Sequence, residues 1–411
     1  MLKAYKYRIY PNKEQEEFFA KTFGCCKFVW NKMLNEKLSA YAEKKPMLLV
    51  ISAKYKKEFH FIKEVNSYVL LNVRLQLEKA FRNYFKNPKH FGLPQLKKKK
   101  HKQSYTTNNM NNSIKVNFEK EMLYLPKIKK LKTKKGIKIK LHRIFEGKIK
   151  SVTLLKTKDG EYYISILVET EEPGNKFTKP KSGTCGINLG IEHFVTINND
   201  LRTYKVEHPK FLRQIEKKLK KSQKDLSRKQ KRSNNYEKVR RYLAELHACI
   251  SNARNDFLHK LSKAIIDENQ VVVMEDINVK RLMKSNFANY ISNSGWSKFL
   301  TYIRYKAKWY GRTLVQADRF FLSSKLCHCC GYKKEGLALH ERTWVCSACG
   351  ELHDRDVNAS VNLLYLVGLE RPEVKPVKHA LVDKPYPIRI SKKPSCWEAK
   401  SSTLYKVGQF T

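Results

Sequence analysis

The sequence lacks long apolar runs and is poor in acidic residues. No stretch of about 18 consecutive apolar residues occurs in it, so we expect no membrane-spanning helix. Its first ten residues, MLKAYKYRIY, mix basic and aromatic side chains where a secretion signal needs an apolar stretch. Only 38 Asp and Glu stand against 84 Lys and Arg, which gives a formal net charge of +46. These absences argue against export, against a membrane partner and against most enzymes of small molecules.

The residues that are present predict a globular protein that binds a polyanion. Hydrophobic residues make up 41% of the 411 residues and aromatic residues 11%, enough for two to four domains with cores of their own. The positive charge is spread over several segments that also carry aromatic side chains, which favours nucleic acid over an anionic membrane. We therefore expect a cytoplasmic, nucleoid-associated protein.

The first 180 residues predict strands around a helical region. Residues 2–10 alternate as a half-exposed strand does, and their basic side chains suggest a nucleic-acid-binding outer face. Apolar residues recur at helical spacing over Lys13–Tyr41 and Val65–Phe85. Three later segments alternate like strands and predict a small antiparallel barrel that includes the first strand. The basic residues of the first strand are Lys3, Lys6 and Arg8, and the later strands are Met122–Pro126, Lys138–Leu141 and Tyr162–Glu169.

Polar residues interrupt the second predicted helix. They could form an ordinary solvated face, or they could contact base edges in a DNA groove. Both interpretations stay open from the sequence. The residues are Asn66, Ser67, Asn72, Arg74 and Gln76.

Several segments concentrate positive charge. Lysine runs cover 97–102 and 127–140, and residues 209–242 hold 14 basic and 3 acidic residues along an approximate apolar stripe. So many like charges repel one another unless phosphates neutralise them, which favours a basic helix that crosses a nucleic-acid backbone. A turn at Ser233 separates it from a second helix. The residues that we expect on nucleic acid are Lys217, Lys221, Lys224, Arg228, Lys229 and Arg232.

Four cysteines have the spacing of a structural zinc site. Cys327 and Cys330 form one Cys-x-x-Cys-Gly pair, Cys346 and Cys349 form another, and 15 residues separate the pairs. In such knuckles the glycine lets the backbone turn its amides toward the sulfurs, and four thiolates leave no open position for chemistry. The spacing predicts a zinc ribbon in which His328 and Cys329 are not ligands.

Three further segments carry candidate cation ligands. QVVVME reads as a buried strand that delivers Glu275, and TCGINLGIEHFVTI reads as a hairpin with Asn188 pointing away from its apolar neighbours. In HDRDVNASVNLL, Asp354 and Asp356 precede an apolar helix, where helix capping is the simplest role. This order suits a ribonuclease-H-like nuclease, which holds two divalent metals between carboxylates.

The amino-acid sequences of these segments resemble those of one family. GINLGIEHFVTI, VVVMEDINV, GWSKFLTYIRYKAKWYGR, RFFLSSKLCHCCG and HDRDVNASVNLL are similar to the TnpB family, the RNA-guided DNA endonucleases of insertion sequences and relatives of type V CRISPR effectors. The resemblance covers nearly the whole chain. It implies a guide RNA, a double-stranded DNA target with a short adjacent motif, structural zinc and catalytic magnesium.

The resemblance also implies an α/β multidomain organisation. A wedge-like β-barrel and a helical recognition domain would precede a ribonuclease-H-like RuvC nuclease domain that is interrupted by the zinc ribbon. The expected boundaries are 1–12 for the first barrel strand, 13–105 for the recognition domain, 106–180 for the remaining barrel, 181–320 for the first part of the RuvC-like domain with basic helices at 209–262, 321–350 for the zinc ribbon, 351–375 for the last RuvC-like part and 376–411 for a C-terminal tail.

One position departs from the family. Glu275 and Asp356 match its second and third metal-binding acids, but Asn188 stands at the first. A neutral amide removes a charge from a site that holds two cations, so magnesium binding should be weak or absent. No replacement is evident, because Glu192 follows the turn at Gly190 and Asp200 lies beyond the second strand.

The sequence therefore predicts an RNA-guided DNA-binding protein that is nuclease-inactive or strongly impaired. It could be a natural, repressor-like binder or an engineered inactive nuclease. Two alternatives remain, an active RNA-guided endonuclease and a guide-free zinc-ribbon DNA-binding accessory of transposition. Whether the protein is a monomer or a dimer does not follow from the sequence.

Overall fold

The computed structural model divides the chain into two compact units, Met1–Pro173 and Gly174–Thr411. It describes residues 1–46, 53–98, 103–128, 136–171, 180–209, 211–284, 288, 291, 294–338 and 340–368. The predicted tail, 376–411, lies outside the described residues. So do residues 99–102 and 129–135, which belong to the two lysine runs. None of the helices in the described ranges is long and apolar enough to cross a membrane.

The first unit packs helices against an antiparallel sheet. Asn12 and Gln15 form a capping box at the start of α1, and both α1 and α3 bury one apolar face against the sheet. The two predicted helices, Lys13–Tyr41 and Val65–Phe85, are thus present within two residues of their expected ends. The elements are β1 (Leu2–Tyr10), α1 (Lys13–Ala42), α2 (Ala53–Glu58), η1 (His60–Glu64), α3 (Ser67–Lys86), β2 (Gln103–Asn108), β3 (Lys115–Asn117), β4 (Met122–Tyr124), β5 (Ile137–Lys140), β6 (Lys148–Lys156) and β7 (Tyr162–Glu169).

The sheet of the first unit has seven strands in the order β2-β6-β7-β1-β5-β4-β3. β1 lies inside it and pairs with β7 on one side and β5 on the other, so the first strand joins the later ones as predicted. The closed barrel that we expected is not formed. Within the described ranges, no pairing joins the edge strands β2 and β3. β3 and β4 have only three residues each, too few to offer the long edge that closure needs.

The second unit is built on a five-stranded sheet in the order β10-β9-β8-β11-β12. β8, β9 and β10 form an antiparallel meander, whereas β11 runs parallel to both β8 and β12. The elements are β8 (Ser182–Leu189), β9 (His193–Asn199), β10 (Thr203–Glu207), α4 (Phe211–Arg228), α5 (Asn234–Glu268), β11 (Asn269–Glu275), α6 (Val279–Leu282), α8 (Trp296–Trp309), β12 (Thr313–Ala317), β13 (Thr343–Val345), β14 (Leu352–Asp354), α9 (Arg355–Leu364) and η3 (Tyr365–Val367).

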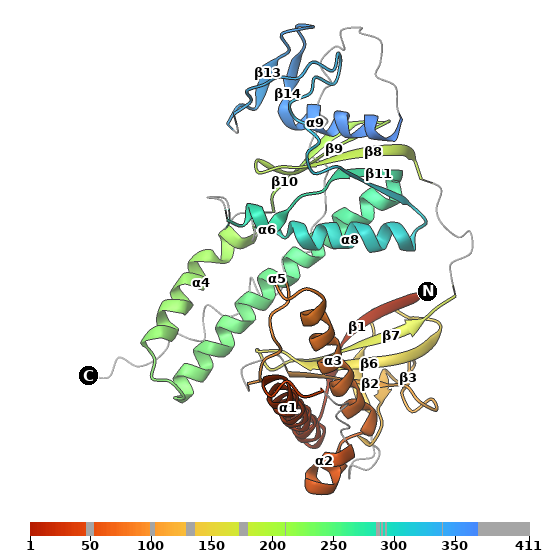
Figure 1. Cartoon of the computed structure of the whole chain (residues 1–411), viewed down its shortest axis with the longest axis vertical. Coiled ribbons are helices and arrows are strands. Elements are labelled where there is room, and N and C mark those ends of the chain that lie inside the picture. The colour runs from red at the N-terminus through yellow and green to blue at the C-terminus, as the bar shows by residue number, and fades with distance from the viewer. Residues whose placement is uncertain are drawn as a thin grey trace. The chain divides into compact units, whose positions relative to one another are not determined.

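Helices cover both faces of this sheet (Figure 1). Ile187 and Val272 point toward α5 and α8, where the main core of the unit lies. On the opposite face, Val273 packs with Leu363 of α9. Because side chains alternate along a strand, Asn188 and Glu275 must project on the α9 face. The alternation of side chains along β8 and β11 therefore places Asn188 and Glu275 on the face that α9 covers.

The basic segment at 209–242 forms a helical hairpin. α4 and α5 pack through a small cluster that includes Ile215, Leu246 and Ile250. Ser233 caps α5 by accepting a hydrogen bond from the amide of Tyr236, at the predicted turn.

Candidate functional site

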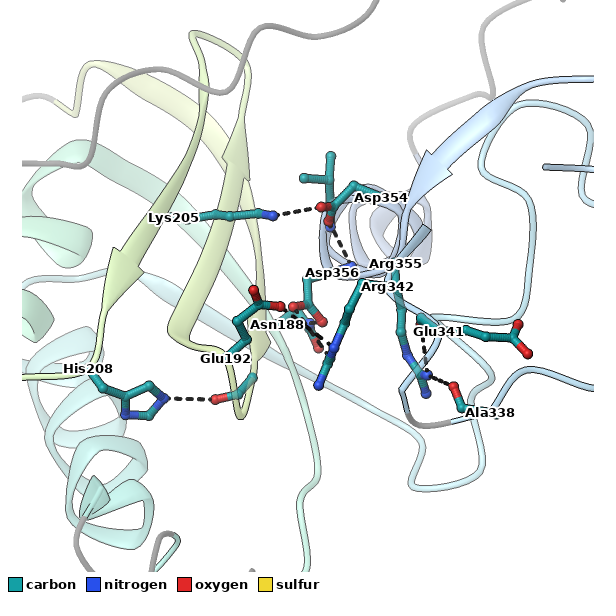
Figure 2. Close-up of polar contacts among 12 residues, drawn as sticks. Asn188, Glu192, Lys205, His208, Ala338, Glu341, Arg342, Asp354, Arg355 and Asp356 are labelled. Atoms are coloured by element: carbon teal, nitrogen blue, oxygen red, sulfur yellow. Dashed lines mark hydrogen bonds and ion pairs between the residues drawn. The ribbon is translucent and has the colours of Figure 1, made fainter. Parts of the chain in front are cut away.

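Three segments distant in sequence meet in one cleft. Asn188 comes from the end of β8, Glu275 from the end of β11 and Asp356 from the first turn of α9. The Asn188 Nδ2 donates a hydrogen bond of 3.1 Å to Asp356 Oδ1 (Figure 2). All three residues line a cleft of about 490 Å³. The structure thus brings together the three positions that the resemblance singled out.

Glycines in the β8 motif allow this meeting. A Cβ atom at Gly186 would lie 2.0 Å from the carbonyl oxygen of Ser360, because α9 packs directly on the backbone of β8 there. A Cβ at Gly190 would lie 2.9 Å from the carbonyl oxygen of His193 and 3.5 Å from Asp356 Oδ2. Gly186 is therefore required for the close approach of α9, and Gly190 for the turn that follows Asn188, roles that strand patterning alone does not indicate.

The two aspartates at the start of α9 have different roles. Asp354 caps the helix, since its Oδ1 accepts hydrogen bonds of 3.0 Å from the amides of Asp356 and Val357. Lys205 holds the other oxygen of Asp354 at 2.7 Å. Capping, the simplest role for both residues in the sequence, thus applies to Asp354, and Asp356 is left to face the cleft.

Glu275 is held by a loop that α9 fixes in place. The Ser323 hydroxyl donates to Glu275 Oε1. Asn362 Nδ2 in turn donates to the carbonyl oxygens of Ser323 and Leu326 at 2.8 and 2.7 Å, and Asn358 Nδ2 donates to the carbonyl of Leu326 at 2.7 Å. Sequence reasoning missed Ser323, Asn358 and Asn362, because no spacing rule links them to Glu275, which lies 48 to 87 residues earlier.

Both carboxyl groups of the cleft favour protonation more than usual. Burial raises the pKa of Glu275, the hydrogen bond from Ser323 lowers it in part, and the nearby Asp356 raises it again. Burial also raises the pKa of Asp356, as does Asp354, while three basic neighbours lower it. Two acids with raised pKa values in one cleft form a site that a cation would stabilise.

Basic side chains enter the same cleft from the segment between the cysteine pairs. Arg342 Nη1 lies 4.0 Å from Asp356 Oδ2, and Arg342 Nε lies 3.6 Å from Glu192 Oε2 (Figure 2). The turn at Gly190 therefore carries Glu192 back toward Asp356, which sequence reasoning did not anticipate. Asp200 lies elsewhere, since its Oδ2 accepts hydrogen bonds from Ser182 and the amide of Gly183 at the start of β8.

The donor set does not fit a pair of divalent cations held between the three family positions. A carboxylate can only accept a hydrogen bond, so the amide nitrogen of Asn188 is the group that faces Asp356. In this arrangement the amide nitrogen faces Asp356, and the neutral Asn188 side chain adds no negative charge to the cleft. Glu275 and Asp356 supply two carboxylates, fewer than a two-metal phosphodiester site requires.

The four cysteines are positioned to hold a metal such as zinc. The Sγ atoms of Cys327, Cys330, Cys346 and Cys349 all lie within 4.8 Å of one another, and two of the Sγ–Sγ distances are 3.6 Å. The amide of Cys330 faces Cys327 Sγ at 3.5 Å. Both following glycines have positive φ, +78° and +73°, as the knuckle pattern predicts.

The cysteine cluster is tied to α9. Asn358 Oδ1 accepts a hydrogen bond of 3.0 Å from the amide of His328, inside the first knuckle. His353, which directly precedes the helix cap, places Nε2 3.0 Å from Cys327 Sγ. The cluster and the cleft therefore share the same helix, although their ligands come from different segments.

The predicted nucleic-acid residues of β1 do not share one face. Lys6 is exposed and stacks over the Tyr163 ring at 4.4 Å, and Arg8 lies beside it on the same face. Arg8 also forms an ion pair of 2.5 Å with Glu161. Lys3 falls on the opposite face of the strand, together with the buried Tyr7, because side chains alternate.

The polar residues of α3 have mixed environments. Asn66 caps the helix through the amide of Tyr68, and Asn72 donates to Asn108 of β2 at 3.2 Å. Arg74 pairs with Glu78 at 3.5 Å. Ser67 and Gln76 are exposed.

The basic residues of the helical hairpin are aligned. Four of them recur at intervals of four, three and four positions, so they form one exposed stripe on α4, and two more are exposed in the connection to α5. This α4 stripe consists of Lys217, Lys221, Lys224 and Arg228, and the connection holds Lys229 and Arg232.

Comparisons with protein families match three parts of the chain. Residues 165–286 match the family described as "Probable transposase", and residues 296–363 match "Cas12f1-like, TNB domain". Residues 1–46 match "Helix-turn-helix domain", a segment that here forms β1 and α1. The matched parts include Asn188, Glu275, Asp356 and the four cysteines.

Two relatives and one solved structure extend these matches. The chain is 37% identical over 374 residues to a protein of Streptomyces pristinaespiralis named as an RNA-guided DNA endonuclease, and the match covers 88% of each chain. It is 26% identical over 386 residues to the RNA-guided DNA endonuclease InsQ of Escherichia coli (strain K12), covering 88% of this chain and 92% of that protein. Its fold resembles Cas12f1 in a cryo-EM complex with sgRNA and target DNA, with a TM-score of 0.53 and 14% identity over 88% of this chain and 98% of that chain. The chain therefore belongs to the TnpB family.

Proposed function

We propose that this protein is an RNA-guided DNA-binding protein whose nuclease activity is absent or strongly impaired. The observation that carries the proposal is the hydrogen bond from Asn188 to Asp356 beside Glu275. Asn188, Glu275 and Asp356, which the resemblance matches to the family's three metal-binding acids, line one cleft, and one of them is an amide. Relatives named RNA-guided DNA endonucleases support the guide and the target, and the donor set argues against two bound cations.

The second unit, in this proposal, is a RuvC-like nuclease domain of the ribonuclease H type. Its strand order, with a β8–β10 meander beside two parallel strands, supports this assignment. The cysteine segment, 321–350, is a zinc ribbon inserted between 181–320 and 351–375. Residues 13–105 form a helical recognition domain, and 1–12 with 106–180 form a wedge-like domain around an open sheet.

Guide RNA and DNA backbones are the ligands that we propose for the basic surfaces. The α4 stripe and the exposed face of β1 can each contact several phosphates, whose neutralisation provides most of the affinity of such complexes. Target sequence is read by pairing with the guide, and the protein reads a short adjacent duplex motif.

We assign the reading of that motif to the α3 region, where Ser67 and Gln76 are exposed. A binding screen with randomised flanking sequence tests this assignment. Substituting Ser67 and Gln76 together with Asn66 and Asn72 should change the tolerated motif. An unchanged motif would mean that another part of the protein reads it.

The substitution Asn188→Asp tests the proposed function. With guide RNA and a matched duplex, the unmodified protein should bind the target and leave it intact, whereas Asn188→Asp should cleave it in the presence of Mg²⁺. We expect the rates to differ by about two to four powers of ten, the usual effect of one electrostatic group in a catalytic site. The cleavage rate is measured under single-turnover conditions, and the affinity for the target is measured separately at equilibrium.

Two matched variants make the result specific. Asn188→Ala removes the amide without adding charge and should remain inactive. Asn188→Asp combined with Glu275→Gln should also be inactive, which would place the restored activity in this cleft. Cleavage by the unmodified protein at a rate near that of Asn188→Asp would overturn the proposal. Full duplex affinity in an RNA-free preparation would favour the guide-free accessory instead.

A further inference from the structure

The turn between β8 and β9 and the start of α9 bring together a second group of side chains of the types that bind cations. One carboxylate oxygen from each of Glu192 and Asp356 and one ring nitrogen of His193 lie within 4.8 Å of one another. Nδ1 of His193 is inaccessible to solvent and has no hydrogen-bond partner in the described part of the chain. An unpaired buried polar atom is costly, and the His193 ring keeps one nitrogen that no protein group in the described ranges engages.

We propose that Glu192, His193 and Asp356 bind one divalent transition-metal cation of the Mn²⁺ type. Ligand atoms that share one cation at about 2.2 Å can be at most about 4.4 Å apart. The observed limit of 4.8 Å therefore requires only a small side-chain adjustment. An imidazole beside two carboxylates suits Mn²⁺, Zn²⁺ and related ions better than Mg²⁺, which favours oxygen ligands alone.

The backbone of the turn is shaped for this contact. Gly190 lets the turn close on itself, since a Cβ there would lie 2.9 Å from the carbonyl oxygen of His193, and the same position faces Asp356 Oδ2 at 3.5 Å. His208 steadies the turn from the other side, with Nε2 3.1 Å from the carbonyl oxygen of Gly190 (Figure 2). The three side chains thus come from two elements, the β8–β9 turn and α9, that pack against each other.

Arg342 competes for the same two carboxylates. Its guanidinium lies 3.6 Å from Glu192 and 4.0 Å from Asp356, where the charge of a cation would act. These separations are long for an ion pair, and partly exposed pairs contribute little stability. A divalent ion with direct coordination can therefore displace Arg342.

This site differs from the two-cation site of a nuclease, although the two would share Asp356. It does not use Glu275 or Asn188, so it does not depend on the proposed function or on cleavage. It also differs from the cysteine cluster, because Mn²⁺ binds carboxylates and imidazole in preference to thiolates.

Binding of Mn²⁺ alone to the full chain tests the proposal. RNA is first removed by nuclease treatment, because phosphates also bind Mn²⁺, and free Mn²⁺ is then titrated by electron paramagnetic resonance. Glu192→Gln, at an exposed position, should weaken the binding of one Mn²⁺ by about tenfold or more. Arg342→Gln should strengthen it, since the competing charge is gone. Pulsed measurements should detect a nitrogen coupling that His193→Gln removes.

Glu275→Gln is the matched control, because it neutralises a carboxylate of the same cleft that is outside the proposed ligand set. It should lower Mn²⁺ affinity much less than Glu192→Gln does, because it removes a nearby charge but no ligand. Weaker binding in Glu275→Gln with normal binding in Glu192→Gln would overturn the proposal in favour of the family's metal positions. Equal Mn²⁺ affinity in all variants would overturn the proposal, because it would indicate adventitious binding only. Circular dichroism confirms that each variant is folded.

Discussion

The cysteine cluster and the carboxylate cleft are two groups of candidate cation ligands that both contact α9, but the first is specified by local sequence and the second by packing. The cluster takes all its ligands from one segment of 23 residues, Cys327 to Cys349. The cleft takes Asn188, Glu275 and Asp356 from three elements that span 169 residues. Ligands close in sequence need only local turns, whereas distant ligands need the sheet and the helix to be packed correctly.

The comparison explains why the two arrangements respond differently to change. The cluster keeps a complete set of four cysteines. One amide in the cleft alters the charge of the whole site, because its members act on the same ligand. A local site should therefore fail when a ligand is lost, and a site assembled by packing should fail when either a ligand or a packing contact is lost.

The largest expected effect is the loss of zinc from the cluster. Cys327→Ser removes one of four thiolates, and structural zinc contributes about 10–16 kcal/mol to small domains of this kind. We expect metal analysis to find one zinc in the unmodified protein and none in the variant. Hydrogen exchange should rise over 320–350 while α5 and β11 stay protected. A native protein without zinc would contradict the assignment, and Cys329→Ser, outside the ligand set, should keep its metal.

The recovery of cleavage by Asn188→Asp is the next largest effect, about 3–5 kcal/mol in activation free energy if the gain is two to four powers of ten. It tests whether the cleft differs from an active site in one charge only. An inert Asn188→Asp variant that still binds its guided target would mean that the cleft lacks more than this carboxylate.

The substitution Gly186→Ala should disable the cleft by disrupting packing, without changing any of its polar side chains. The new methyl would lie 2.0 Å from the carbonyl oxygen of Ser360, so α9 must move away from β8. We expect a loss of about 1–3 kcal/mol in the free energy of unfolding, measured by denaturant titration. In the Asn188→Asp background the same change should also lower the cleavage rate.

Gly336→Ala is the control for this packing effect, since nothing lies within 4 Å of a Cβ there. It should leave stability and cleavage almost unchanged. Equal behaviour of the two alanine variants would show that α9 does not depend on close contact at β8.

A similar loss should follow from Asn358→Ala, which tests whether the cluster and the cleft are coupled. The buried amide joins Leu326 to the His328 knuckle, and its removal leaves polar backbone groups unpaired at a cost of about 1–3 kcal/mol. Zinc affinity and the cleavage rate in the Asn188→Asp background should both fall. A change in only one of them would separate the two sites.

The smallest effect should come from the α4 stripe. Changing its four basic residues to Gln removes phosphate contacts that lie far from either cation site. The slope of log affinity for guide RNA against log salt should fall by about 3, at about 0.7 for each contact. If a control with four scattered substitutions shows the same slope as the stripe variant, the RNA-binding surface does not lie on the α4 stripe. The control residues are the exposed lysines Lys13, Lys44, Lys57 and Lys120.

The sequence by itself determined the local features of this protein. Helical and strand periodicity predicted α1, α3 and β7 nearly to their ends, since one buried face imposes a repeat on the chain. The spacing of Cys327, Cys330, Cys346 and Cys349 predicted their cluster, because knuckle geometry is local. The strand that delivers Glu275 was recognisable because a continuous apolar run marks burial on both faces.

Only the tertiary structure decided which polar residues meet. Glu192 and Asp200 both follow β8 in the sequence without a local signal that separates them. The fold carries Glu192 back to Asp356 and places Asp200 at the opposite end of β8, against Gly183. The roles of Arg342 and Ser323 likewise appear only where α9 and the cysteine segment pack on the sheet. Side-chain periodicity specifies a face, but contacts between distant segments depend on how those faces pack.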